Sequence, residues 1–401
     1  MLRVAWLGIA QMSAWGCLLY SFPMLAEALL AEFGWSRFSV YAAGSVAMAS
    51  AAIGAYPVGR WIDLGYGRAV MCLGGLLGAG VLCCLPAITA VWQLYGLYTL
   101  MGLALAASLY EPLFACVTNC FGVQQARYII PRLTLWAGFA SLVFMPYTQM
   151  LIDTLGWRLA MPVLGLTFII IAPGIYFCLL NSPLNEKHKK GCVDQKAHSE
   201  GTLRSVHKSA VFWYLVVAFA GYGLIQAGLN FHLFAILLEK QLSVSTAIWL
   251  VAVLGPVQVA GRVWLMVLLR RRAATSAAVM LTLFQPLVLL AMYLSAAVVP
   301  VWVVIIVFYG LLGGSLIIVK GIVIIDYFPD YSYGRVNALL TAPYNLAQAV
   351  APLVGAALWL LGSSYDSYLW VLFGVSVIMP LSFYLALREH NKGQAAVSNI
   401  A

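Results

Sequence analysis

The sequence predicts an all-α membrane protein with 12 transmembrane helices in two pseudo-symmetric halves of six. The composition, the number of long apolar stretches and an internal repeat all predict this fold class. Of the 401 residues, 63% are hydrophobic and only 9% are charged, whereas soluble domains average about 25% charged residues. A bilayer crossing needs about 20 apolar residues, so the chain has room for about a dozen crossings. A soluble enzyme is excluded.

Twelve apolar stretches of suitable length are bounded by charged or turn-forming residues. Six of them precede a polar gap and six follow it. The expected helices span residues 5–30, 38–59, 69–89, 92–118, 133–151, 159–180, 211–238, 245–268, 276–298, 302–325, 336–361 and 367–387.

The polar gap also sets the domain boundaries. We expect an N-terminal six-helix bundle at 1–180, a cytoplasmic linker at 181–210, a C-terminal six-helix bundle at 211–388 and a cytoplasmic tail at 389–401. The linker is basic and its histidines are irregularly spaced, which is typical of a flexible connection without a metal. The eight cysteines have neither disulfide nor zinc spacing. No cleavage pattern follows the first stretch, so we expect a retained helix.

The distribution of basic residues predicts the orientation. Of the 22 lysines and arginines, 17 lie on the side that holds both termini, and only Arg37, Arg158 and Lys240 lie in loops on the other side. Cytoplasmic loops carry the excess of basic residues, so both termini are expected in the cytoplasm and the protein in the inner membrane of a cell. Membrane insertion thereby explains the net charge of +9, and no nucleic-acid partner is expected.

Two matches between the halves indicate an internal repeat. Gly59-Arg60 after the second helix matches Gly261-Arg262 after the eighth at an offset of 202 residues. The ends of the fourth and tenth helices match as well: Phe121 and Phe328 each precede an arginine, Arg127 and Arg335. Repeats of this kind are typical of secondary transporters.

The loop after the second helix resembles the signature of the major facilitator superfamily, with Leu64 in place of the usual basic residue. The matching residues are Gly59, Asp63, Gly67 and Arg68, with Arg60 beside the first glycine. The resemblance implies that this loop latches the two halves on the cytoplasmic side. We expect Gly59 to allow close packing of helix ends, and Asp63 to lie near a helix N-terminus and pair with an arginine.

At a finer level the chain resembles bacterial relatives of the monocarboxylate and oxalate/formate porters. The residues that carry this resemblance are Phe33-Gly34-Trp35-Ser36-Arg37, Tyr110-Glu111-Pro112-Leu113-Phe114 and Gly156-Trp157-Arg158. One departure concerns the eighth helix, where such porters often carry an acid one turn before an arginine. Here Gln258 precedes Arg262, which puts a proton site at that point in doubt.

Two ionisable residues inside helices are candidates for the site, because such groups are costly in a bilayer unless they face a polar interior. Glu111 lies about 12 Å from the inner end of the fourth helix, and Pro112 after it tends to kink that helix. It is either a proton carrier or a fixed ion-pair acid. Lys320, about 9 Å from the inner end of the tenth helix, either bridges to Glu111, binds an anionic substrate or snorkels to the interface.

Further candidates are polar residues in apolar surroundings. Arg262 with Gln258 forms either a clamp for a carboxylate or the gate arginine of the second half. His232, with Asn230 and Gln226 nearby, is either a buried neutral histidine or a contact for substrate or proton. Hydroxyls of Tyr20, Tyr110, Tyr222 and Tyr309 could line a cavity. Glu27 is expected to reach water at the outer end of the first helix, without a role.

These features favour a proton-coupled secondary transporter that moves a small organic solute by alternating access, with a monocarboxylate-like anion and inward symport as first choice. The alternative within transport is a carrier of a larger heteroaromatic solute, for vitamin uptake or drug efflux. An enzyme is not expected, because the chain has no H-E-x-x-H motif, nucleophile elbow or P-loop. We expect no cofactor, the proton gradient as energy source, and a monomer.

Overall fold

The computed structural model describes residues 2–121, 123–180, 206, 208–269, 274–328 and 333–398. These residues are helical apart from short connections, and no strand occurs among them. Twelve of the helical segments are long and apolar enough to cross a membrane. The expected fold class is therefore confirmed.

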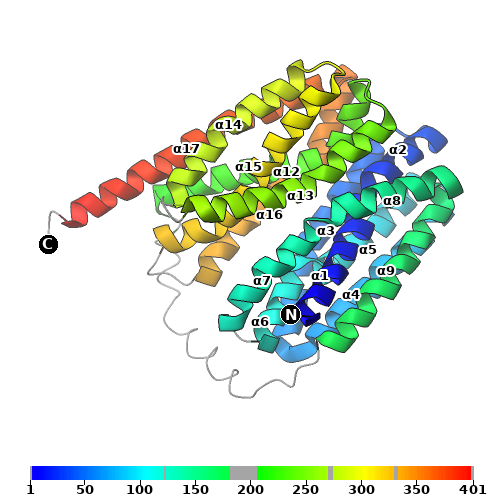
Figure 1. Cartoon of the computed structure of the whole chain (residues 1–401), viewed down its shortest axis with the longest axis horizontal. Helices are drawn as coiled ribbons and strands as arrows, with labels where there is room; N and C mark the ends of the chain where they lie inside the picture. Colours follow the sequence, from blue (N-terminus) through cyan, green and yellow to red (C-terminus); the bar gives the residue numbers. More distant parts are fainter. Residues whose placement is uncertain are drawn as a thin grey trace. The chain divides into compact units, whose positions relative to one another are not determined.

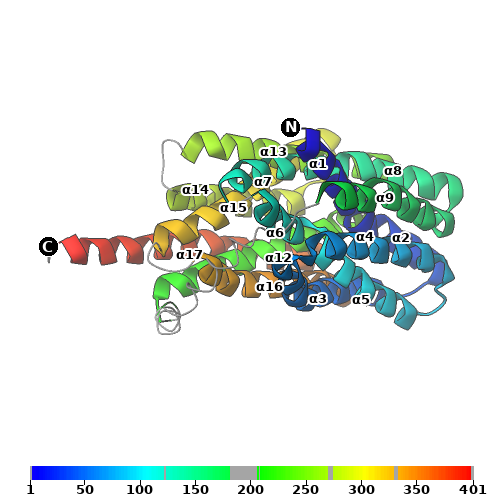
Figure 2. The ribbon, with the colours of Figure 1, turned by 90° about the horizontal axis from the view of Figure 1, so that it is seen from below.

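The first half comprises six spans, several of them divided into shorter elements (Figure 1). In chain order the elements are α1 Leu2–Ala14, η1 Trp15–Tyr20, α2 Phe22–Phe33, α3 Arg37–Trp61, η2 Ile62–Tyr66, α4 Gly67–Cys84, η3 Leu85–Ala87, α5 Val91–Ser108, α6 Tyr110–Phe121, α7 Val123–Ala137, α8 Ala140–Leu155 and α9 Trp157–Leu179. Helix α3 packs against α5 and α4 against α9, and α3 and α5 lie side by side in Figure 2 as well.

The second half has one long helix for each span. Its helices are α12 Ala210–Glu239, α13 Val244–Leu269, α14 Ala274–Leu294, α15 Val299–Tyr327, α16 Tyr333–Gly362 and α17 Asp366–Ser398. Helix α14 packs against both α15 and α17. The residues of α17 beyond 387 extend the helix past the expected membrane span.

Interruptions in the first half depart from the simple apolar pattern. The first span contains the π-helical segment Trp15–Tyr20, and π-helical turns are frequent at functional sites. The fourth span breaks at Leu109, whose backbone is extended (φ −83°, ψ −157°), because Pro112 cannot continue the hydrogen-bond ladder. The fifth span is interrupted between Ala137 and Ala140.

The described chain forms two compact units that do not coincide with the two halves of the sequence. The first unit comprises Met1–Leu184, Asn230–Pro256 and Pro352–Ser363. The second comprises Asn185–Leu229, Val257–Ala351 and Ser364–Ala401. In the first unit the ring of Phe22 contacts Tyr41, Tyr98 and Phe231 edge-on, so a segment of α12 completes the core of the N-terminal helices.

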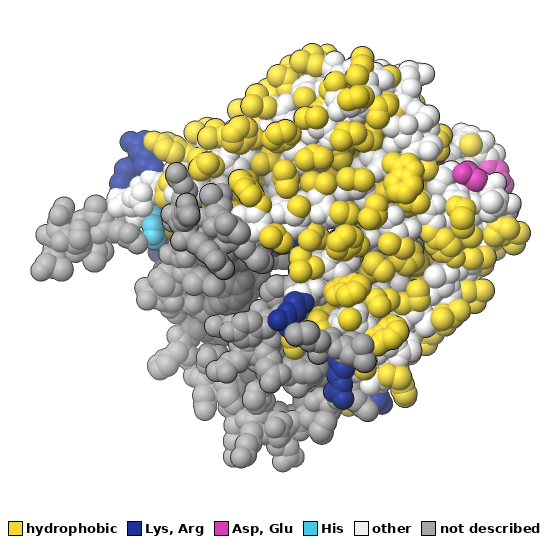
Figure 3. All heavy atoms as spheres, in the orientation of Figure 1, with side chains coloured by type: hydrophobic (Ala, Val, Ile, Leu, Met, Phe, Trp, Pro, Cys, Tyr) yellow, Lys and Arg dark blue, Asp and Glu magenta, His cyan; other side chains and the backbone are white. Residues whose placement is uncertain are grey.

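The surface is apolar where a soluble protein would be polar. Hydrophobic side chains cover most of the described helices on the face drawn in Figure 3. Ile53, Tyr56 and Ile170 are 76%, 80% and 79% exposed. Exposed apolar surface on this scale marks contact with a membrane or a partner, and with 12 candidate spans it indicates a multi-pass membrane protein.

Candidate functional site

In the second unit, side-chain hydrogen bonds connect α12 and α13 to the middle of α15. The hydroxyl of Tyr222 donates to the Gly313 carbonyl over 2.7 Å, and the hydroxyl of Tyr309 donates to Gln226 Oε1 over 3.3 Å. The hydroxyl of Ser315 donates to the Gly261 carbonyl of α13 over 3.0 Å. Tyr222, Gln226 and Tyr309 are buried, so both tyrosine hydroxyls are engaged inside the unit.

Lys320 lies about 8 Å further along α15 than Ser315, at 1.5 Å per residue. Its ammonium stands 4.0 Å from the centroid of the Tyr344 ring. That ring is stacked at 6.0 Å on Tyr222, and its hydroxyl accepts a hydrogen bond from Gln348 Nε2 over 3.0 Å. An aromatic face attracts a cation while leaving its N–H donors available to other acceptors. The Tyr344 ring therefore forms one side of the surroundings of the amine.

Arg262 is the second cation of this unit, and it is 6% exposed. The helices α13 and α15 approach closely beside it, because a Cβ at Gly261 would collide with the Leu311 backbone and one at Gly314 with Gln258. Gln258, one turn before Arg262, is also buried. Arg60, the counterpart of Arg262 in the repeat, is exposed. The two arginines that the repeat relates thus differ in burial, since Arg262 is buried in its unit and Arg60 is exposed.

In the first unit, the candidates of the first and fourth spans lie together. The ring of Trp15 lies 6.0 Å from that of Tyr20 and 5.1 Å from that of Tyr110. The hydroxyl of Tyr110 donates to the Thr134 carbonyl over 3.3 Å. Glu111, in the first turn of α6, is exposed and makes no ion pair with the described residues of its unit. Because Lys320 belongs to the other unit, their pairing stays a prediction.

A buried amide near Glu111 was not predicted. Gln11 is fully buried, and its Nε2 donates to the carbonyls of Ser108 and Leu109 over 2.7 and 3.2 Å. A neutral amide inside an apolar stretch is the signal that could have identified it, because such groups bond across helices in membranes. Gln11 was not among the candidates because its side chain is not ionisable.

His232 lies among residues of the first unit and is fully buried. Its ring is stacked on Tyr41 with 4.3 Å between centroids, and its Nε2 lies 2.9 Å from the Pro352 carbonyl oxygen. A Cβ at Gly355 would collide with the imidazole, so that glycine makes room for it. Asn230 is half-buried in the same unit, whereas Gln226 belongs to the other.

Glu27 takes part in a network, contrary to the expectation that it only reaches water. It pairs with Arg37 over 2.7 Å and accepts from the Tyr41 hydroxyl over 3.2 Å. The Arg37 guanidinium lies 4.9 Å from the centroid of the Trp359 ring, whose Nε1 donates to Glu239 over 3.0 Å. The network connects α2 and α3 with segments of α12 and α16 in the same unit.

The signature loop is arranged differently from the expectation at Gly59. Among the described residues, no atom lies within 4 Å of where a Cβ would stand at Gly59, whereas at Gly67 it would lie 2.5 Å from Cys116 Sγ. Gly65 has φ +96°, which favours glycine. The guanidinium of Arg68 lies 4.5 Å from the centroid of the Phe177 ring. The side chains of Asp63, Arg127 and Arg335 lie outside the described part of the chain.

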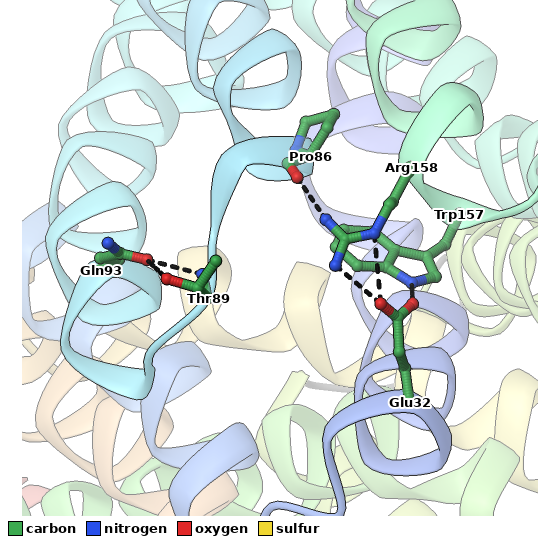
Figure 4. Close-up of polar contacts among 6 residues, drawn as sticks. All are labelled: Glu32, Pro86, Thr89, Gln93, Trp157 and Arg158. Atoms are coloured by element: carbon green, nitrogen blue, oxygen red, sulfur yellow. Dashed lines mark hydrogen bonds and ion pairs between the residues drawn. The ribbon is translucent and has the colours of Figure 1, made fainter.

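One of the motifs that resemble the monocarboxylate porters, Gly156-Trp157-Arg158, joins helix ends, as Figure 4 shows. The Trp157 indole and the Arg158 guanidinium both donate to Glu32, and Arg158 also donates to the Pro86 carbonyl. The Arg158 to Glu32 distance is 2.7 Å. Nearby, Gln93 accepts from the Thr89 backbone N–H over 2.7 Å. These contacts give Trp157 and Arg158 a structural role in the first unit.

Twelve apolar helices among the described residues, with Arg262 and several amides and hydroxyls buried within the units, define the class of a polytopic membrane protein. Among the described residues, no group of three or more His, Cys, Asp or Glu side chains could hold a metal ion. The sequence model of the Major Facilitator Superfamily matches residues 7–317, and the chain therefore belongs to this superfamily. The match covers most of both halves.

Solved structures agree with this assignment at the level of the fold. The crystal structure of the nucleoside transporter NupG superposes with a TM-score of 0.72 at 13% identity, over 96% of this chain and 98% of that one. An inward-facing, unoccupied bacterial homologue of the human lysosomal transporter Spinster gives 0.74 at 15%, over 98% and 97%. A D-xylose-proton symporter gives 0.72 at 14%, over 96% and 97%. A search of curated protein sequences finds no match.

Proposed function

We propose that this member of the superfamily is a secondary active transporter of a small organic anion, with a monocarboxylate as first choice and proton coupling. The observation that carries the proposal is the environment of the two cations of the second unit. Lys320 is held on the ring of Tyr344, and Arg262 is buried on the neighbouring helix α13. The Tyr344 ring is in turn stacked on Tyr222 and bonded to Gln348.

An anion would supply the negative charge that suits such a site. A buried cation is costly unless a counter-charge or hydrogen-bond acceptors surround it. The planar guanidinium of Arg262 can donate two parallel hydrogen bonds to a carboxylate, while the ammonium of Lys320 acts as a point charge. We infer that the two cations attract the solute and that the stacked rings of Tyr222 and Tyr344 contact its carbon skeleton.

The proton would be carried by Glu111. Glu111 lies exposed in the first turn of α6, without an ion pair among the described residues of its unit. We propose that Glu111 exchanges partners with Lys320 during the transport cycle. In this proposal the protein acts as a monomer in the inner membrane with both termini in the cytoplasm, and no cofactor is needed.

A second candidate function rests on the aromatic pairs. Tyr222 stacks on Tyr344 in one unit, and Trp15 lies against Tyr110 in the other. Such rings favour flat solutes by stacking, so a heteroaromatic solute, taken up or expelled, is the alternative. The difference between the candidates lies in charge: a heteroaromatic solute without a carboxylate does not require both cations.

Transport into proteoliposomes tests both candidates. Uptake of labelled lactate, pyruvate, oxalate, a nucleobase and a neutral sugar would be measured with and without an imposed pH gradient. The proposal expects gradient-driven uptake of at least one carboxylate, its loss in Glu111→Gln, and its retention in the control Gln149→Leu, which changes an amide bonded to Asp153 on α8. Gradient-driven uptake retained in full by Glu111→Gln would refute the proton role. Uptake of the nucleobase alone would favour the alternative.

A further inference from the structure

The break in the fourth span lies immediately before the residue proposed to carry the proton. Helix α5 ends at Ser108 and α6 begins at Tyr110, with Leu109 extended between them. Pro112 has no N–H, so the Ser108 carbonyl loses the partner that the fourth residue along a helix normally supplies. The next possible bond, from the Leu113 N–H to the Leu109 carbonyl, is long at 3.5 Å.

Gln11 of α1 supplies the shortest hydrogen bonds to both carbonyls, and the Tyr176 hydroxyl also donates to the Ser108 carbonyl over 3.5 Å. Gln11 Nε2 donates to the Ser108 carbonyl over 2.7 Å and to the Leu109 carbonyl over 3.2 Å. The Tyr176 hydroxyl of α9 lies 3.3 Å from the same nitrogen. The amide of Gln11 thus stabilises the break at one place and in one orientation.

The start of α6 is held from the other side by aromatic packing. Tyr110 contacts Trp15 in η1, stacks on Phe114 and donates to the Thr134 carbonyl of α7. Because α6 begins directly after the break, the position of Leu109 determines where the helix points and therefore where the Glu111 carboxyl group lies. The first turn of α6 is fixed between Gln11 and these contacts.

The second half has a related contact without a break. Counted back thirteen residues from Phe121 and Phe328, Ser315 is the counterpart of Ser108. There a side chain of the half's first helix, Tyr222, donates to the Gly313 carbonyl, yet α15 runs uninterrupted from Val299 to Tyr327. The break is therefore particular to the half that carries the acid.

Two polar atoms beside the break have no hydrogen-bond partner among the described residues. They are Gln11 Oε1 and Ser108 Oγ, both fully buried. Native interiors contain few such atoms, and a contact that only supported the fold would gain stability by satisfying them. Gln11 Oε1 and Ser108 Oγ could therefore accept and donate further hydrogen bonds beside the break.

We infer that Gln11 is a positioning residue for proton transfer: by holding the break between α5 and α6, it sets the surroundings in which Glu111 gains and loses its proton. This inference rests on the proposed function, in which Glu111 is the proton carrier. Gln11 acts through the backbone and need not touch the solute.

The test measures the protonation of Glu111 directly and needs no knowledge of the solute. Dicyclohexylcarbodiimide reacts with protonated carboxyl groups in apolar surroundings, and mass spectrometry of the full chain in nanodiscs would report labelling of Glu111 as a function of pH. Gln11→Met keeps the length of the side chain and removes the donors. The inference expects its labelling midpoint to shift by about half a pH unit or more from wild type, whereas Gln149→Leu stays at the wild-type midpoint.

A double-mutant cycle with Pro112→Ala separates positioning from general destabilisation. Alanine at residue 112 provides the backbone N–H that can bond to the Ser108 carbonyl, so α5 and α6 can form one continuous helix. Gln11 is then no longer needed to hold a break between them. Pro112→Ala is expected to shift the midpoint by itself, and Gln11→Met added to it should change little, because both act through one break. If Gln11→Met does not fold, the comparison of Pro112→Ala and the double variant with wild type decides.

Four results would overturn the inference. They are an unchanged midpoint in folded Gln11→Met, an unchanged midpoint in Pro112→Ala, additive shifts in the double variant, or no labelling of wild-type Glu111 at any pH. Failure of the proposed function has a different signature. In that case Glu111→Gln retains gradient-driven uptake, whereas the labelling midpoints still report whether Gln11 controls the carboxyl group.

Discussion

The imidazole of His232 lies flat on the phenol ring of Tyr41, with 4.3 Å between the ring centroids and 23° between the planes. Both residues are fully buried. Since His232 belongs to the seventh span and Tyr41 to the second, this pair ties a segment of the second half to the helices of the first within one compact unit.

Removing the ring of Tyr41 is expected to destabilise this unit strongly. Tyr41→Ala leaves a cavity against His232 and Phe22, with an expected loss on the order of 3 kcal/mol. Tyr41→Phe keeps both ring contacts and loses only the hydroxyl that donates to Glu27, so its expected loss is about 1 kcal/mol. Thermal unfolding of the purified protein in detergent would measure both, and equal losses would contradict the dominant role of stacking.

The ion pairs Arg37–Glu27 and Arg158–Glu32 of the first unit should contribute differently to the stability of the fold. The Arg37 and Glu27 side chains are 24% and 21% exposed, whereas those of Arg158 and Glu32 are both 41% exposed. Arg37→Gln also removes the contact with Trp359, so we expect a loss of about 1–2 kcal/mol. Glu32→Gln should cost less than Arg37→Gln, because water and salt screen its more exposed ion pair. Melting temperatures at low and high salt would rank them, and a larger loss in Glu32→Gln would contradict the ranking.

Substitutions at Lys320 and Tyr344 should show how much the charge and the aromatic contact each contribute to the apparent affinity for the anion. Lys320→Gln removes the cation, and the apparent affinity for the transported anion is expected to fall about tenfold or more. Tyr344→Phe keeps the aromatic face under the ammonium and should have a small effect, while Tyr344→Leu should lower affinity by about threefold. The readout is the concentration dependence of uptake in proteoliposomes. Equal affinity in Lys320→Gln and wild type would exclude direct binding of the anion.

The glycines of the signature loop form a matched pair. Gly67→Ala forces a Cβ against Cys116 Sγ and should cost about 1–3 kcal/mol, whereas Gly59→Ala meets open space and should be neutral or slightly stabilising. Melting temperature and yield in the membrane fraction would compare them. A greater loss in Gly59→Ala would show that this position needs glycine for a contact in another state of the transport cycle.

The helices could be predicted from the sequence because the physics involved is local. A long apolar run must be helical in a bilayer so that its backbone is satisfied, and the expected span 159–180 corresponds to α9, Trp157–Leu179. The kink at Pro112 was also predicted, since proline acts on its own backbone. The break appears three residues earlier, at Leu109, because a proline disrupts the helical turn that precedes it.

The partners of the candidate residues could not be predicted, because contacts between helices depend on rotation and depth. Hydropathy gives no sign that Tyr344 underlies Lys320 or that Tyr41 covers His232. Glu27 looked like a solvated acid because its distance to Arg37 along the chain says nothing of their 2.7 Å ion pair. The repeat relates Arg262 to Arg60 in sequence, yet it does not predict that Arg262 is buried where α13 packs on α15 and that Arg60 is exposed.

The composition of the first unit has a consequence for any attempt to produce the N-terminal six helices as a fragment. Truncation after residue 180 would strip Phe22 of Phe231 and Tyr41 of His232, and would remove the Leu353 N–H that donates to Ser45 Oγ over 3.0 Å. The fragment would insert into the membrane with Phe22 and Tyr41 no longer covered by their aromatic partners. Supplying the missing half as a separate polypeptide in the same cell should restore these contacts.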